Sequence, residues 1–124
     1  MANFSRIVVM AAAVAGALLA ASAHAQPSDT DYPNRTVKIV VSAPAGGGLD
    51  IAARIIAEKL RQHFGQPFIV ENRPGAAGNL GAEAVSVADP DGYTLLAAQP
   101  SPLTVNQFLY RKLNFDPAAF VRVA

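Results

Sequence analysis

One stretch, residues 36–50, constrains the fold of this chain more than any other. Residues 37–41 are apolar and β-branched apart from Lys38, which is typical of a strand that is buried on both faces of a parallel sheet. Three consecutive glycines follow at 46–48, and a helix is expected to begin near Asp50. Because backbone N–H groups and the positive end of the helix dipole face one point in such a turn, the stretch predicts an anion-binding loop.

The rest of the chain alternates between strand and helix patterns. The expected elements are a strand over 37–41, a helix over 50–64, a strand over 68–72, a helix over 80–88 capped by Asn79, a strand over 94–98, a short helix over 103–110, and strand character at 120–123. This alternation predicts an α/β fold with a parallel sheet. Right-handed crossovers would give the strand order 2-1-3, with a helix on each face.

The helix expected over 50–64 has an amphipathic pattern. Its apolar positions recur at spacings of three and four and are therefore expected to face the core: Ala52, Ile55, Ile56, Leu60 and Phe64. Gly65 is expected to end the helix, and Pro67 prevents its continuation.

The candidate site lies where the strands end. Ligands of parallel α/β sheets bind beyond the carboxyl ends of the strands, beside the point where the strand order reverses. Three loops are expected to meet there, at 43–50, 73–79 and 99–102, and Pro74-Gly75 fits the centre of a type II turn. A tight structural turn remains the alternative interpretation of the first loop.

Several kinds of chemistry have no support in the sequence. The run Ala-Gly-Gly-Gly-Leu-Asp is neither a G-x-G-x-x-G fingerprint nor a P-loop. Ser42 and Ser101 have no assignable base, and His63 is expected on a helix surface. The acidic residues are scattered without metal-ligand spacing, and the absence of cysteine excludes disulfides and thiolate metal sites.

The first 25 residues have the pattern of a secretory signal peptide. Residues 7–21 form an unbroken apolar run, and Ala23-His24-Ala25 is a small-x-small cleavage site, so cleavage after Ala25 and a periplasmic location are predicted. A membrane anchor, the alternative, would need about 20 apolar residues. Without Arg6 the chain carries nine basic and nine acidic residues, a balance that gives no support for nucleic-acid binding.

Four ordered motifs resemble the receptors of tripartite tricarboxylate transporters, also called the Bug family of extracytoplasmic solute-binding proteins. They lie at 32–54, 70–84, 90–96 and 106–110, and Val70-Glu71-Asn72-Arg73-Pro74-Gly75-Ala76-Ala77-Gly78-Asn79 is the most specific. The resemblance implies a two-lobed receptor without catalytic activity or cofactor. Residues 26–35 would be an N-terminal extension and 36–124 the N-terminal portion of the first lobe. The implied partners are a small carboxylate solute and membrane permease subunits, and the receptor would be a monomer.

The resemblance also suggests which residues hold the solute. Backbone N–H groups of two glycine-rich loops would bind a carboxylate, and the side chains of Asn79 and Ser101 would add hydrogen bonds. The candidate residues are Ala45, Gly46, Gly47, Gly48, Asp50, Gly75, Ala77, Gly78, Asn79 and Ser101. The sequence departs from the family pattern at Ala43, where an aromatic residue is usual, and at Leu49, where a hydroxyl is usual.

Two other interpretations stay open on the sequence alone. A small α/β enzyme could act on a phosphorylated or nucleotide substrate, although the missing phosphate motifs and the lack of a catalytic constellation argue against it. The chain could also be an inactive, truncated gene product.

Overall fold

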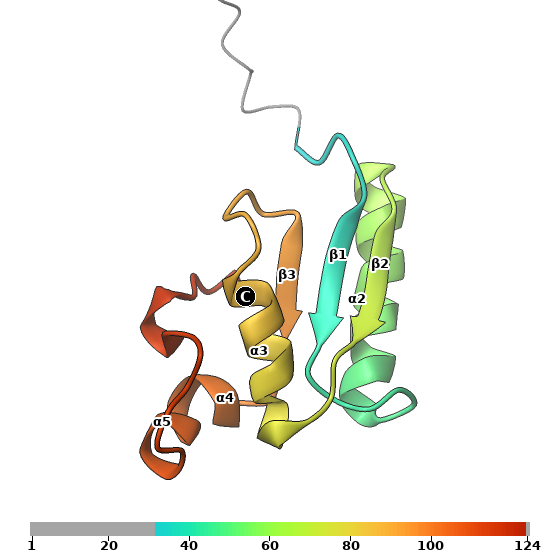
Figure 1. Ribbon diagram of the computed structural model, residues 1–124. Helices are drawn as coiled ribbons and strands as arrows, with labels where there is room; N and C mark the ends of the chain where they lie inside the picture. Colours follow the sequence, from blue (N-terminus) through green and yellow to red (C-terminus); the bar gives the residue numbers. More distant parts are fainter. Residues whose placement is uncertain (1–31, 124) are drawn as a thin grey trace, which may run out of the picture. The chain divides into compact units, whose positions relative to one another are not determined.

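The computed structural model describes residues 32–123, which build a three-stranded parallel sheet with helices on both faces (Figure 1). The chain divides into two units, residues 1–32 and 33–124, and every helix and strand of the described residues lies in the second. In chain order they are β1 (Val37–Val41), α2 (Gly48–Phe64), β2 (Phe68–Asn72), the 3₁₀ turn η3 (Ala76–Gly78), α3 (Asn79–Ser86), β3 (Thr94–Ala97), α4 (Ser101–Thr104), α5 (Asn106–Leu109) and the 3₁₀ turn η4 (Pro117–Ala119). The predicted signal peptide lies outside the described residues.

The sheet has the predicted order, β2-β1-β3, with both pairs parallel. Ile39 in the central strand is in register with Val70 of β2 and Leu95 of β3. Val37 and Val41 are completely buried, because strands flank β1 on both sides and helices cover its two faces. The three strand arrows in Figure 1 therefore point the same way, and their carboxyl ends share one edge.

The two longer helices cover opposite faces of the sheet. Ala53 and Ala57 of α2 pack against Ile39 and Val41. On the other face α3 comes very close to β1, since a Cβ added to Gly81 would lie 2.8 Å from the Cβ of Ser42. A side chain at Gly81 would therefore push α3 off the sheet.

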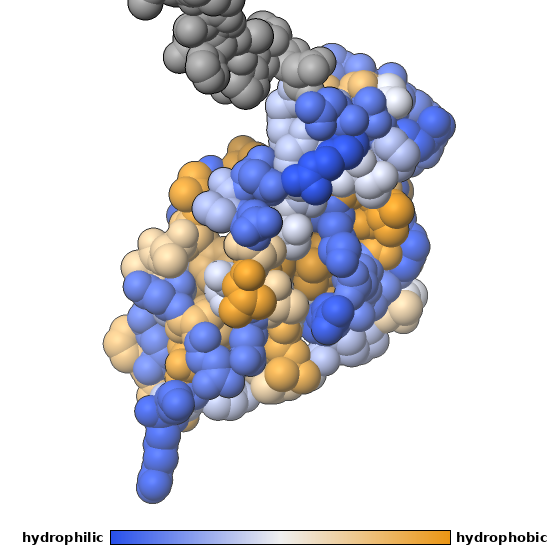
Figure 2. Space-filling view, turned by 45° about the horizontal axis from the view of Figure 1, so that its top comes forward, coloured by the Kyte–Doolittle hydropathy of each residue, from blue (hydrophilic) through white to orange (hydrophobic). Residues whose placement is uncertain are grey.

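The predicted core-facing stripe of α2 is wrong except at Leu60, which packs against the core. Ile55 and Ile56 are 60% and 55% exposed, whereas Asp50, Ala53 and Ala57 are buried. Asp50 fixes the rotation of the helix, because its carboxylate turns inward to accept a hydrogen bond from the Gly46 N–H. Ala53 and Ala57, three and seven positions later, lie on the same side of the helix and therefore also face inward. The isoleucines remain on the flank, and Figure 2 shows apolar residues reaching the surface in patches among hydrophilic ones.

Several element boundaries also differ from the prediction. Helix α2 begins at Gly48, two residues early, and α3 begins at Asn79 itself, so that Gly78 and not Asn79 is its cap. The helix expected over 103–110 starts at Ser101 and is divided at Val105. Residues 120–123 form no strand, and among residues 32–123 no helix is long and apolar enough to cross a membrane.

Residues 33–35, just before β1, contact the rest of the domain. Pro33 is buried, the backbone N–H of Asn34 donates to the Tyr93 hydroxyl at 3.0 Å, and Arg35 forms an ion pair with Asp91 at 2.6 Å. These residues belong to the stretch that the sequence assigned to an N-terminal extension, and they join the start of β1 to the turn before β3.

Candidate ligand-binding site

The three predicted loops meet at the carboxyl edge of the sheet. The N–H of Arg73, just after β2, donates to Val41 O at 2.8 Å, and the N–H of Ser42 donates to Ala97 O at 3.0 Å. The side chain of Asn72 donates to Ala43 O at 3.1 Å. Hydrogen bonds therefore fix the start of each loop relative to its neighbour.

A buried carboxylate braces the first loop. Asp50 is 2% exposed and accepts hydrogen bonds from the Gly46 N–H at 2.8 Å, Arg54 Nε at 3.1 Å and Asn72 Nδ2 at 3.0 Å. The bond from Arg54, followed by those from Gly46 and Asn72, lowers the Asp50 pKa to about 2. The candidate residues Asp50 and Gly46 are thus placed together, with the carboxylate directed into its own loop.

The next two glycines are different, because nothing in the described chain requires them. Gly47 has φ −76° and ψ 164°, which any residue can adopt, and an added Cβ would lie 3.4 Å from Pro44 O. A Cβ on Gly48 would meet nothing within 4 Å. The backbone of Gly47 and Gly48 is therefore exposed and not covered by a side chain. It lies beside the exposed Ala45, at the N-terminus of α2.

The second loop has an unusual backbone. Gly75, Ala76, Ala77 and Gly78 all have positive φ, between 48° and 122°. Gly75, with φ 122° and ψ 159°, is far from the type II geometry that the sequence suggested. For the two alanines this conformation costs roughly 1–2 kcal/mol each, so strain is concentrated next to the N-terminus of α3.

Gly78 is required by packing. A Cβ on it would lie 2.6 Å from Pro102 Cγ and 3.3 Å from Ser42 Oγ, so α4 can pack against the second loop only at a glycine. Ser42 Oγ is buried and has no hydrogen-bond partner among the described residues. Ser101, the first residue of α4, is half-buried and its side chain makes no hydrogen bond within residues 32–123.

Sequence reasoning missed Asn106. This residue is 1% exposed, and its Nδ2 donates to Asn79 Oδ1 at 2.6 Å and to Ala77 O at 3.2 Å. Asn106 lies three and four positions after Leu103 and Pro102, on the side of the helical segment that packs inward. In the sequence, only the position of this amide at the spacing of core residues could have indicated its role. Its partners, Asn79 and Ala77, are 27 and 29 residues away.

Gly78→Ala is expected to destabilise the fold by about 2–4 kcal/mol, because it combines a positive φ with a clash against Pro102. Gly65→Ala is the matched control, since Gly65 has φ 71° but nothing within 4 Å of its added Cβ. The control should lose only about 1 kcal/mol in urea unfolding. Equal losses for the two variants would show that Pro102 moves aside freely.

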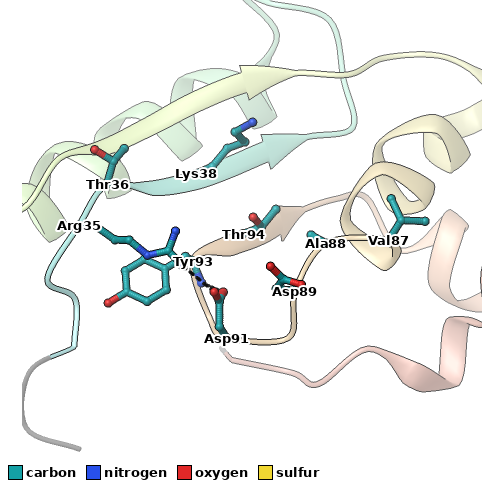
Figure 3. Close-up of a pocket in the computed structure, with 9 residues that line it drawn as sticks. All are labelled: Arg35, Thr36, Lys38, Val87, Ala88, Asp89, Asp91, Tyr93 and Thr94. Atoms are coloured by element: carbon teal, nitrogen blue, oxygen red, sulfur yellow. Dashed lines mark hydrogen bonds and ion pairs between the residues drawn. The ribbon is translucent and has the colours of Figure 1, made fainter. Parts of the chain in front are cut away.

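A hollow of about 380 Å³ lies at the opposite edge of the sheet (Figure 3). The Arg35 guanidinium stacks 4.0 Å above the Tyr93 ring and pairs with Asp91, while Lys38 pairs with Glu71 at 2.9 Å. Both cations facing this hollow are therefore engaged. No group of three His, Cys, Asp or Glu residues within 32–123 could hold a metal ion.

Comparison with known proteins identifies the family. The model of the tripartite tricarboxylate transporter family receptor matches residues 52–123, more than half of the chain. The chain belongs to this receptor family. The resemblance carried by the sequence motifs is thereby confirmed, and the family is one of solute-binding receptors.

Relatives of this chain support the family assignment over most of its length. Protein BugT of Bordetella pertussis is 42% identical over 115 residues, covering 91% of this chain and 34% of BugT. A UPF0065 protein of Bordetella bronchiseptica is 44% identical over 103 residues, covering 83% of this chain and 30% of the relative. The chain therefore spans about a third of the length of these relatives.

Solved structures show the same fold. R. palustris Rpa4515 with adipate is 41% identical with a TM-score of 0.67, and the match covers 71% of this chain and 29% of the Rpa4515 chain. MatC from Rhodopseudomonas palustris with bound malate is 38% identical with a TM-score of 0.64, covering 69% and 29%. The predicted α/β lobe of a periplasmic binding protein is thus confirmed for the part of the chain that aligns.

Proposed function

We propose that the protein is an extracytoplasmic receptor that captures a small carboxylated solute for a tripartite tricarboxylate-type transporter. Residues 36–124 would form the N-terminal portion of its first lobe, and cleavage after Ala25 would release it into the periplasm as a monomer. Ala45 to Gly48 and Gly75 to Asn79 would line the solute site, with Ser101 at its margin. The membrane permease subunits would receive the solute.

The observation that carries this proposal is the bare backbone at Gly47 and Gly48. Both residues have room for a side chain within the described structure, and Gly47 has ordinary angles, so the fold itself gives no reason for glycine. A ligand that approaches the backbone closely would give one. The same two residues lead into α2, whose first N–H groups and dipole favour a negative charge.

The charges around the loops favour recognition by the backbone. Arg54 is paired with Asp50 at 3.1 Å, and Arg73 with Glu71 at 2.6 Å, so the basic side chains beside the two loops already have carboxylate partners. Within the first loop the Gly46 N–H already donates to Asp50 at 2.8 Å and the Gly47 N–H to Pro44 O at 3.4 Å, so a carboxylate solute would depend on the N–H groups at the start of α2 and on the Asn79 amide. The adipate and malate in the two solved relatives are ligands of this chemical class.

Titration of the ¹⁵N-labelled chain with adipate and with malate tests the function. Amide signals of residues 46–48 and 75–79 should shift together, with one dissociation constant for all of them. Hexane-1,6-diol is the control, because it has the chain length of adipate without carboxylates, and it should leave these signals in place. Equal shifts with the diol, or adipate shifts confined to the hollow around Arg35, would contradict the proposed site.

A further inference from the structure

The side chains of Asn79 and Asn106 form a buried amide pair beside the second loop. Asn79 is 7% exposed and Asn106 is 1% exposed, and the bond from Asn106 Nδ2 to Asn79 Oδ1 is short, at 2.6 Å. The same Nδ2 donates to Ala77 O at 3.2 Å, in the segment of positive φ. Both N–H groups of the Asn106 amide are therefore engaged.

This pairing determines which end of the Asn79 amide remains available. Since Oδ1 accepts from Asn106, the other end presents Nδ2, which makes no hydrogen bond within residues 32–123. Among residues 32–123, Ser42 Oγ is the only fully buried side-chain nitrogen or oxygen atom without a hydrogen-bond partner. Asn79 Nδ2 also has no partner in this range, so it is not fully buried and keeps contact with solvent. The end of the Asn79 amide that remains available, Nδ2, can donate but cannot accept.

We propose that Asn106 is a positioning residue that holds the Asn79 amide with its N–H groups toward the solute, and thereby selects carboxylates. This inference rests on the proposed function and adds a residue to it. A carboxylate oxygen accepts from such a donor, and the charge strengthens the bond. A carboxamide can offer only its single oxygen to this donor, because its N–H group cannot replace the second carboxylate oxygen.

The unmodified chain provides the first test. The two side-chain amide protons of Asn79 give their own signals, assigned by their loss in Asn79→Asp, and adipate should shift them with the dissociation constant of the Gly47 and Gly48 amides. Asn79→Asp keeps an acceptor for Asn106 but replaces the donor by a negative charge, so adipate binding should weaken roughly tenfold or more. If the loop amides shift while the Asn79 side-chain signals stay fixed, the inference is wrong and the proposed function stands.

Asn106→Asp tests whether Asn106 affects the solute by orienting the Asn79 amide. An aspartate at 106 can only accept, so Asn79 must turn its amide to donate to it and present oxygen to the solute. The ratio of adipate affinity to adipamide affinity should then fall roughly tenfold or more. Gln107→Glu is the matched control, because it adds the same charge at the next position, where the exposed side chain bonds only Thr104 O.

The outcomes separate the two proposals. An unchanged affinity ratio in Asn106→Asp, or the same change in Gln107→Glu, would overturn the positioning role. If Asn106→Asp does not fold, the Asn79 side-chain signals and Asn79→Asp still decide. The absence of any shift in residues 46–48 and 75–79 with adipate or malate would instead contradict the proposed function.

Discussion

Asp50→Asn is expected to lower the melting temperature of the chain by roughly 10 °C, although it changes only one atom of the side chain. The carboxylate accepts three hydrogen bonds at a position that is 2% exposed, from Gly46, Arg54 and Asn72. An asparagine has one acceptor oxygen and would direct its own N–H groups at the remaining donors. The first loop should therefore lose the hydrogen bonds that fix its conformation, and α2 should lose the contact that fixes its rotation.

Glu58→Gln is the control for removing a carboxylate from the same helix. Glu58 pairs with Arg61 at 2.8 Å, but both side chains are about half exposed, so this change should move the melting temperature by only a few degrees. Thermal unfolding followed by circular dichroism measures both variants. Similar losses in the two variants would mean that the Asp50 network is no more important than a surface ion pair.

Acid should weaken the fold through the same carboxylate. The Asp50 pKa is lowered from 3.8 to about 2 by Arg54 and by the N–H groups of Gly46 and Asn72. A lowered pKa in the folded state stabilises the fold above pH 4, and this stabilisation is lost as the pH falls from 4 toward 2. Glu58 shifts in the same direction through Arg61 and Gln62, but salt screens that exposed group. Urea unfolding in high salt should therefore show a smaller loss between pH 4 and 2 in Asp50→Asn than in the unmodified chain.

Apart from the strand character expected at 120–123, which is wrong, local sequence and the right-handed crossover rule are the reason that the strands and the sheet order were predicted correctly. The rotation of α2 was not, because two overlapping apolar stripes share Leu60, and periodicity cannot choose between them. Asp50 makes the choice through a hydrogen bond to the loop. The amide pair of Asn79 and Asn106 is a tertiary contact across 27 residues, and no local pattern predicts it.

The glycines illustrate the same limit within the candidate site. The two loops looked alike in the sequence, each a glycine-rich turn before a helix. In the structure Gly75 and Gly78 have positive φ, and a Cβ on either would lie within 2.7 Å of Leu80 or Pro102. Gly47 has ordinary angles and room for a side chain. Glycine occurs in both loops, but the reason for glycine at each position depends on its backbone angles and on the atoms around it, which the sequence does not show.

Gly47→Val is therefore expected to abolish adipate binding while leaving the fold intact. The backbone at Gly47 is extended, a region that valine favours, and the Cβ would make an ordinary contact with Pro44 O at 3.4 Å. Because Gly47 is the N-cap of α2, where valine is disfavoured, the free energy of unfolding should fall by no more than about 1 kcal/mol. The two valine methyl groups would occupy the space in which a solute carboxylate approaches the N–H groups, so affinity should fall by roughly tenfold or more.

Gly65→Ala should behave in the opposite way, and the pair of variants separates binding from folding. Gly65 ends the same helix α2 with φ 71°, far along the chain from the loop, so an alanine there strains the backbone and should cost about 1 kcal/mol. Its adipate affinity should equal that of the unmodified chain, because no part of the candidate site changes. Stability from urea unfolding and affinity from the titration of labelled chain are measured on the same samples. Unchanged affinity in Gly47→Val would remove the first loop from the solute site, since a bare backbone that tolerates a branched side chain is not in close contact with a ligand.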